Sequence, residues 1–262
     1  MSGVRANFDR VRAFEDSLEL REKVALACRV LASRGLVDGI LGHVSARVGE
    51  QDLVVRCRTA GEQGLAASTA ADVWRLSFDG TPIDLPGGTL PPNELPIHTE
   101  LMRQRPEIGA VIHAHPPMAL LTGLAGLAPR PVFGAYNIPA MRLALEGVPV
   151  YRRPILVTRP ELADEMLAAM DGRPVCLMAG HGVTVAAETV EQAVVLAVNL
   201  NELLRVTVEL ARLGATPPEV SDADLAELPD LGSEFNYDFV WRALVAELSQ
   251  RQGPAVGLPI RG

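Results

Sequence analysis

The sequence predicts an α/β protein built around a layered, mixed β-sheet. Short apolar strand patterns alternate with helical patterns, without the regular strand–helix–strand rhythm of a doubly wound parallel sheet or a barrel. The two common nucleotide-binding motifs, GxGxxG and GxxxxGK[ST], do not occur. With 262 residues, 48% of them hydrophobic and 21% charged, the chain can bury a large core without disulfides or structural metals.

The first third of the chain predicts one helix and three strands. Apolar residues recur at helical spacing from about Phe8 to Arg34, and Gly35 is expected to end this helix. The segment LVDGILGHVSARV leads from a loop into a strand, and DLVVRC and VWRLSFDG predict two more, the last closing on an Asp-Gly turn. Their close succession favours an antiparallel meander.

Helices and strands alternate through the middle of the chain. A proline- and glycine-rich loop over 81–92 precedes a helix predicted over 94–105, and the apolar strand 108–115 then ends at a Pro-Pro pair. The further elements predicted in this part are a short helix in MALLTGLAG, short strands in VPVYR and PILV, a helix over 160–170, a strand over 174–180 and a long amphipathic helix over 190–212.

The last part of the chain differs in composition from the rest. Past Gly214 it becomes acidic and contains several prolines, a last helix is predicted over 237–250, and RQGPAVGLPIRG is expected to be a frayed tail. We therefore expect one domain over 1–262, with a C-terminal extension from about residue 215.

Charge and cysteine content argue against several functional classes. The formal net charge is −8 and no run of five basic residues occurs, which disfavours binding to nucleic acid or to an anionic membrane. The three cysteines are widely spaced and form no CxxC motif, as expected in a reducing cytoplasm. The charged N-terminus predicts no signal peptide, and the most apolar stretch, 108–128, contains two histidines and a Pro-Pro pair, so it is a poor membrane-spanning candidate.

Three of the five histidines occupy positions that favour metal binding. His113 and His115 lie two residues apart near the end of a predicted strand, so both side chains point to the same face. His181 follows a second apolar strand and lies between two glycines. Three imidazoles that converge from strand ends match a divalent metal site with open coordination positions. Because each motif alone is more often structural, the prediction depends on the whole set together with Glu94.

The segment NELPIHTELMRQRPEIGAVIHAH, residues 93–115, resembles the class II aldolase/adducin family. That family places a Glu at the start of a helix, then Arg-Pro, an apolar strand and His-x-His; its third histidine lies in a Gly-His-Gly similar to residues 180–182. Its N-terminal Gly-Asn-[apolar]-Ser-x-Arg is similar to GHVSAR, residues 42–47. The resemblance spans about residues 20–212. It implies a three-layer α/β/α sandwich around a mainly antiparallel sheet, in a homotetramer with active sites at subunit interfaces.

The resemblance also implies roles for individual residues. One divalent ion per subunit (Zn, Mn, Fe or Co) would be held by three ligands, His113, His115 and His181. Glu94 would move a proton or serve as a displaceable fourth ligand. In several relatives a tyrosine of a neighbouring subunit donates a proton, and Tyr136 and Tyr237 are the candidates here, although a packing role is favoured over a catalytic one for each.

Departures from the family pattern indicate the branch. The sugar-phosphate enzymes have Asn where this chain has His43, a Thr-Pro-Ser-Gly turn at residues 58–61, and a Ser pair at 92–93. Most hydroxyl donors of that phosphate cup are missing, which disfavours a sugar phosphate. The Gly-His-Val-Ser variant resembles the family's decarboxylases, which act on 3,4-dihydroxyphthalate or 2-hydroxy-3-carboxymuconic semialdehyde in aromatic catabolism. We expect a metal-dependent decarboxylase of a hydroxylated aromatic acid; the alternative is a metal-dependent aldolase or epimerase acting on a small, non-phosphorylated hydroxylated substrate.

Both reactions break a bond to carbon, and a bound cation would take up the negative charge that develops on a neighbouring oxygen. Glu94 is expected to work with a pKa raised by burial. His43 is expected to hydrogen-bond the departing carboxylate or to supply a proton, and Arg58 to pair with a carboxylate. Ser45 and Asn93 are assigned to substrate binding.

Structural alternatives stay open for these residues. Glu94 could cap a helix, His43 could brace a turn, Ser45 could be scaffold, Arg58 could be a solvated surface residue, and His98 is expected to make a structural hydrogen bond. A non-catalytic binding role, as in adducin, is disfavoured because all three histidines are present. An iron-dependent oxygenase is a further alternative.

Overall fold

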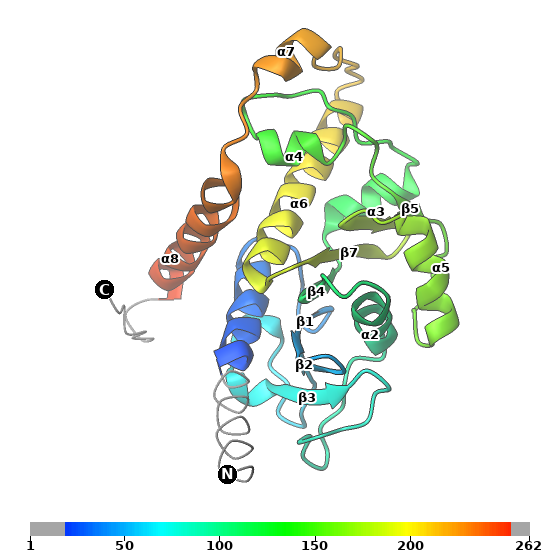
Figure 1. The fold of residues 1–262 in the computed structure, drawn as a ribbon. Coiled ribbons are helices and arrows are strands. Elements are labelled where there is room, and N and C mark those ends of the chain that lie inside the picture. The colour runs from blue at the N-terminus through cyan, green and yellow to red at the C-terminus, as the bar shows by residue number, and fades with distance from the viewer. Residues whose placement is uncertain (1–18, 253–262) are drawn as a thin grey trace, which may run out of the picture.

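In the computed structural model, residues 19–252 form one seven-stranded sheet with helices on both faces (Figure 1). The strand order is β3-β2-β1-β4-β7-β6-β5, and every neighbouring pair is antiparallel except β5 and β6, which are parallel. The predicted three-layer α/β architecture with a mainly antiparallel sheet is therefore confirmed, as is the meander of the first three strands. The strands are β1 (Gly42–Val48), β2 (Asp52–Arg56), β3 (Val73–Ser77), β4 (Ala110–Ala114), β5 (Val150–Tyr151), β6 (Val175–Met178) and β7 (Gly182–Ala187).

Two helices cover one face of the sheet, α2 (Leu95–Gln104) and α5 (Pro160–Met170), which lie to the right of the sheet in Figure 1. Their apolar side chains pack on alternate residues of the strands, such as Val111 of β4 and Cys176 of β6. This alternation follows from the two-residue period of a strand. It leaves the neighbouring residue of β4, Ile112, to the core on the opposite face.

The opposite face carries the helix of residues 19–33, α3 (Pro117–Leu124) and the long α6 (Val190–Arg212). α8 (Val240–Gln252) packs on this layer through Leu244 and Leu248, which are buried in the same core as α6. Shorter elements complete the chain: the 3-10 turns η1 (Leu65–Ala67) and η2 (Ala70–Asp72), the helices α4 (Ile138–Arg142) and α7 (Asp222–Glu227), and the π-helical turn η3 (Glu234–Phe239). Within residues 19–252, no helix combines the length and apolar character needed to cross a membrane.

Most predicted elements are found, with a few differences. The PILV strand is wrong: Pro154 has no N–H for a strand ladder, and the N–H of Val157 donates to the Glu94 carboxylate instead. The strand β7 and the short helices α4 and α7 were not predicted. The last helix begins with η3, earlier than Tyr237. The predicted segment from Phe8 to Leu18 and the tail from residue 253 lie outside the described residues.

Candidate metal centre and active site

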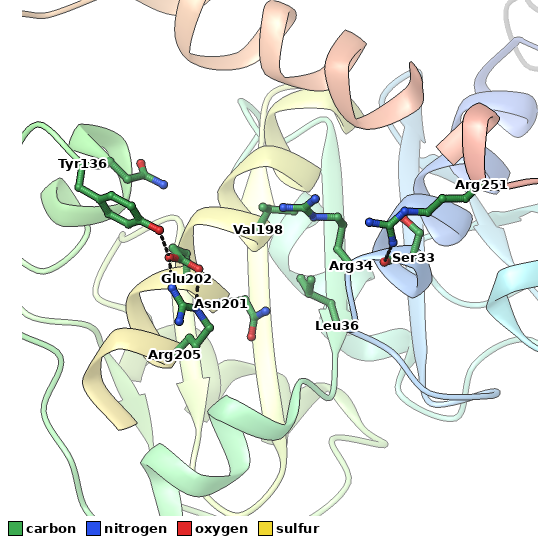
Figure 2. A pocket seen from close by; sticks show the side chains of 10 residues that line it. Ser33, Arg34, Leu36, Tyr136, Val198, Asn201, Glu202, Arg205 and Arg251 are labelled. Carbon is green, nitrogen blue, oxygen red and sulfur yellow. Dashed lines mark hydrogen bonds and ion pairs between the residues drawn. The ribbon is translucent and has the colours of Figure 1, made fainter. Parts of the chain in front are cut away.

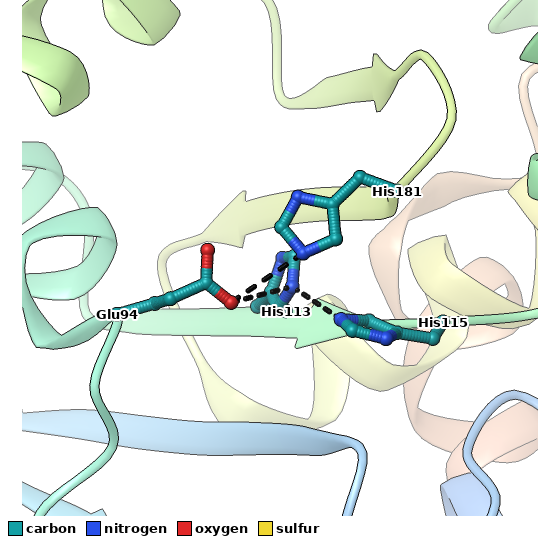
Figure 3. Close-up of side chains that lie close together, drawn as sticks. All are labelled: Glu94, His113, His115 and His181. Atoms are coloured by element: carbon teal, nitrogen blue, oxygen red, sulfur yellow. Dashed lines mark hydrogen bonds and ion pairs between the residues drawn. The ribbon is translucent and has the colours of Figure 1, made fainter. Parts of the chain in front are cut away.

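Two segments of the sheet bring the three candidate histidines to one point. His113 is the fourth residue of β4, His115 follows its end, and His181 lies in the turn between β6 and β7. Because β7 runs antiparallel to β4, with Val183 paired to Ala114, the start of β7 lies beside the end of β4. Figure 3 shows the three imidazole rings gathered together, and the centroids of each pair of rings lie 4.8 Å apart.

Glu94 completes this cluster from the other side (Figure 3). It occupies the N-cap position of α2, but its side chain makes no capping hydrogen bond. Instead, one carboxylate oxygen, Oε1, accepts the N–H of Val157 at 2.8 Å, and the other, Oε2, lies 3.4 Å from Nε2 of His113 and 3.5 Å from Nε2 of His181. The side chain thus points into the histidine cluster, and the helix-capping alternative does not describe what it contacts.

The donor set fits a divalent cation. One ligand atom from each of Glu94, His113, His115 and His181 lies within 4.8 Å of the others. Nε2 of His113 is 2.8 Å from Nε2 of His115, and both ring nitrogens of His181 are buried without a hydrogen-bond partner among the described residues. Buried imidazole nitrogens that converge without other partners are what a bound ion would satisfy.

The protonation states also suit metal binding. Burial and the neighbouring ring of His43 lower the pKa of His113 well below its usual value. Burial and the neighbouring ring of His181 also lower the pKa of His115. Both rings are therefore neutral and carry free lone pairs. Burial raises the pKa of Glu94, but contact with His181 and His113 and the hydrogen bond from Val157 outweigh it and bring the pKa to about 2. The expected raised pKa is thus not found, and Glu94 is ionised.

His43, the first of the remaining candidates, lies directly against the cluster. It is paired with His113 in the register of β1 and β4, and its ring stacks on that of His113 with centroids 5.0 Å apart. Its Nδ1 lies 2.6 Å from Nε2 of His98, whose Nδ1 lies 2.6 Å from the hydroxyl of Ser45. His98 makes the expected structural hydrogen bond, and Ser45 is fully buried against it, away from the cavity that faces the cluster.

A cavity of about 190 Å³ opens beside the cluster, and His43, Glu94 and His115 line it. Arg58 and Asn93 lie on the same wall, where the Arg58 guanidinium donates to Oδ1 of Asn93 at 2.9 Å. Three aliphatic residues, Ile40, Leu41 and Leu156, are also part of the lining. The cavity therefore combines an apolar wall, suited to a ring, with a cation and neutral donors.

Sequence reasoning missed two residues that shape this cavity, Arg56 and its partner Glu62. Arg56 lines it, is buried, and forms an ion pair with Glu62, which also accepts the N–H of Gly64. The ion pair neutralises Arg56 and anchors the loop that follows Arg58. Arg56 is the last residue of β2, and no motif in the sequence around it distinguishes it from an ordinary strand residue.

The two candidate tyrosines lie elsewhere in the chain. Tyr136 is 69% exposed and donates to Glu202 at 2.7 Å, beside a separate cavity of about 570 Å³ that Arg205 also lines (Figure 2). Tyr237 lines a third cavity, of about 680 Å³. Neither lines the cavity beside the histidines of its own chain, so a role for either would require a neighbouring subunit and stays a prediction.

Comparison with known proteins identifies the family. Residues 22–208 match the family described as Class II Aldolase and Adducin N-terminal domain. The chain is 53% identical to the 3,4-dihydroxyphthalate decarboxylase of Arthrobacter keyseri over 87% of this chain and 94% of that protein. It is 47% identical to the enzyme of the same name from Rhodococcus jostii, over 86% and 94%.

Solved structures agree at the level of the fold. An L-fuculose 1-phosphate aldolase from Glaciozyma antarctica superposes with a TM-score of 0.74 at 19% identity, covering 92% of each chain. An aldolase II superfamily protein from Pseudomonas syringae gives 0.72 at 21% identity, covering 90% of this chain and 94% of that one. The extent of the family match and the identity of 53% show that this chain belongs to the class II aldolase and adducin family.

Proposed function

We propose that this chain is a divalent-metal-dependent decarboxylase of a hydroxylated aromatic dicarboxylic acid of the 3,4-dihydroxyphthalate type. The observation that carries this proposal is the 53% identity to a protein with that activity in its name, over 94% of that protein's length. Relatives named as aldolases of 5-deoxyribulose 1-phosphate share only 26–31% identity. The decarboxylase is therefore favoured over an aldolase.

The proposed metal ligands are His113, His115 and His181. Neutral imidazoles leave the full charge of a divalent ion available, whereas thiolates would reduce it. When bound, the ion would supply a Lewis acid that stabilises negative charge on a substrate oxygen.

Glu94 is the proposed proton carrier. Because its carboxyl is ionised, it can take the proton of the hydroxyl group beside the departing carboxylate and pass it to the ring carbon that carries this carboxylate. The carbon–carbon bond then breaks, and its electron pair returns to the ring and to the oxygen that lost its proton, leaving a phenolate. CO2 leaves, and a proton from solvent restores the hydroxyl.

Arg58 is the proposed partner of the carboxylate that the product retains. Of the two arginines in the cavity, Arg56 is paired with Glu62, whereas Arg58 donates to the neutral amide of Asn93 and forms no ion pair among residues 19–252. Its charge is therefore available to a substrate anion. A cation suits the retained carboxylate better than the departing one, because decarboxylation removes negative charge from the latter.

The experiment is direct. The purified protein, loaded in turn with zinc, manganese, iron and cobalt, is incubated with 3,4-dihydroxyphthalate, and CO2 and dihydroxybenzoate are measured; a 5-deoxyribulose 1-phosphate arm measures aldehyde release. CO2 release that disappears in His113→Ala, together with the bound metal, is expected. Aldehyde release without CO2 would overturn the proposal.

We further propose a cytoplasmic homotetramer, in which Tyr136 or Tyr237 of one subunit reaches the cavity of the next. The exposure of Tyr136 leaves it accessible to such a contact. Sedimentation equilibrium gives the subunit number. Tyr136→Phe and Tyr237→Phe, each mixed with an inactive Glu94→Gln chain, test complementation between subunits; no recovery of activity for either would exclude the crossing tyrosine.

A further inference from the structure

A hydrogen-bonded chain of three side chains runs from the core of the sheet to the cavity. The Ser45 hydroxyl lies 2.6 Å from Nδ1 of His98, and Nε2 of His98 lies 2.6 Å from Nδ1 of His43. Ser45 and His98 are completely buried, whereas His43 is partly exposed and lines the cavity. Since Nδ1 of His43 is taken by His98, Nε2 is the ring nitrogen left to meet a ligand.

The number of hydrogen-bond donors determines where the hydrogen atoms lie in the series Ser45–His98–His43. Each of the two short contacts needs one hydrogen, and the Ser45 hydroxyl has no other partner among residues 19–252. If His43 donated to His98 and His98 donated to Ser45, the buried hydroxyl hydrogen would have no acceptor, which is costly. If Ser45 donates to Nδ1 of His98, and Nε2–H of His98 donates to Nδ1 of His43, every donor inside the protein is satisfied. Only this second direction leaves no buried donor unpaired.

We propose that Ser45 and His98 are positioning residues that hold His43 in the tautomer with its hydrogen on Nε2, so that it presents a neutral N–H donor to a carboxylate in the cavity. This inference rests on the proposed function only for the identity of that carboxylate. A neutral imidazole with this hydrogen pattern is a hydrogen-bond donor and a very weak acid. His43 therefore orients the substrate and does not supply the proton, which decides between the two roles predicted from the sequence.

The neutral donor suits the carboxylate that departs. During decarboxylation negative charge leaves this group, so a cation beside it would stabilise the starting state more than the transition state. A neutral N–H also holds the carboxylate in place, but it stabilises the starting state less than a cation would, so the barrier to decarboxylation rises less. The cavity thus offers a charged donor, Arg58, and a neutral donor, His43, to the two carboxylates of one substrate.

The tautomer can be measured without turnover. In the zinc-loaded protein labelled with 15N-histidine, long-range 1H–15N spectra distinguish a protonated Nε2 from a protonated Nδ1, and a His43→Gln variant assigns the signals. We expect hydrogen on Nε2 of His43, and a shift of this N–H signal when phthalate, which lacks the hydroxyl groups, saturates the cavity. Hydrogen on Nδ1, or an N–H signal that phthalate leaves unmoved although calorimetry shows binding, would overturn the proposal.

Two variants and a control test the positioning role. Ser45→Ala removes the donor that orients His98 and should reveal the second tautomer of His43, with kcat/KM lowered by about 10-fold, as expected for one lost hydrogen bond. Ser68→Ala removes a hydroxyl that is equally buried but has no hydrogen-bond partner among residues 19–252, and should change neither value. His98→Gln keeps a donor for His43 and should retain the wild-type tautomer. An unchanged tautomer and kcat/KM in Ser45→Ala would contradict the proposal; the tautomer without any CO2 release would refute only the proposed function.

Discussion

Replacing Gly182 by alanine should weaken metal binding as well as folding. A Cβ at this position would lie 2.3 Å from the carbonyl oxygen of Ala114 and 3.0 Å from Cδ2 of the His115 ring. Because Cβ contacts essentially never fall below 3.0 Å, the two backbones must separate by at least about 0.7 Å, the difference between the two values. Metal sites tolerate ligand displacements of only about 0.2 Å. His115 and His181 flank the displaced segment, so both proposed ligands would move.

The expected loss of metal affinity is about 10-fold to 100-fold, the range found when the residues that orient a metal ligand are changed. The folding cost of the extra methyl group is about 1–3 kcal/mol. Competition with a chelator measures the first, and urea unfolding of the metal-free protein measures the second. Gly87→Ala is the matched control, because a Cβ there meets no atom within 4 Å. Metal affinity in Gly182→Ala within threefold of wild type would refute the assignment of ligands around this turn.

Three further predictions concern proton transfer, substrate charge and acid stability. Glu94→Gln keeps an acceptor for Val157 but cannot carry a proton, so kcat for CO2 release should fall by about 10²–10⁴-fold with metal retained. Glu100→Gln, which replaces another buried glutamate in the same part of the chain, should leave kcat unchanged. A fall of less than about 10-fold in steady-state CO2 release by Glu94→Gln would contradict the role. Arg58→Met keeps the aliphatic stem and removes the charge, so phthalate should bind about 10-fold to 100-fold more weakly by calorimetry, and unchanged binding would exclude the carboxylate contact. Burial lowers the pKa of His98 from 6.5 to about 3, so the unfolded chain binds a proton in this range that the folded chain does not. The metal-free protein should therefore lose stability as the pH falls from about 6.5 towards 3, by up to roughly 5 kcal/mol from this residue, and a free energy of unfolding in urea that is equal at pH 8 and pH 5 would contradict this.

Sequence patterns predicted those elements whose ends carry their own signals. α5 begins at Pro160, and α6 follows Thr189, whose hydroxyl accepts the N–H of Gln192. The helix of residues 19–33 ends just before Gly35, which has a φ of 71°. The strand β7 was missed because all six of its residues are buried. A strand covered on both faces shows no alternation of polar and apolar residues, which is the signal that the other strands offered.

The site was predictable in its residue types but not in its contacts. The His-x-His and Gly-His-Gly motifs identified the candidate ligands, and family resemblance joined them to Glu94. The contact between His43 and His98 spans 55 positions, and that between His98 and Ser45 spans 53. Such contacts depend on the register of β1 and on the rotation of α2 against the sheet, neither of which local patterns encode.

The topology of the sheet explains why residues so far apart meet. β1 and β7 both run antiparallel to β4 and lie on either side of it, so the first residues of both strands lie beside the last residues of β4. The proposed ligands come from the end of β4 and the turn before β7, while His43 comes from the start of β1 on the other side. A change at His43, whose ring stacks on that of His113, can therefore alter the group that meets the substrate without replacing any residue proposed to hold the ion. This arrangement offers a physical reason why relatives named as decarboxylases and as aldolases can share one scaffold: the side chain at position 43 can change what the cavity binds, while the proposed metal ligands come from other segments of the sheet.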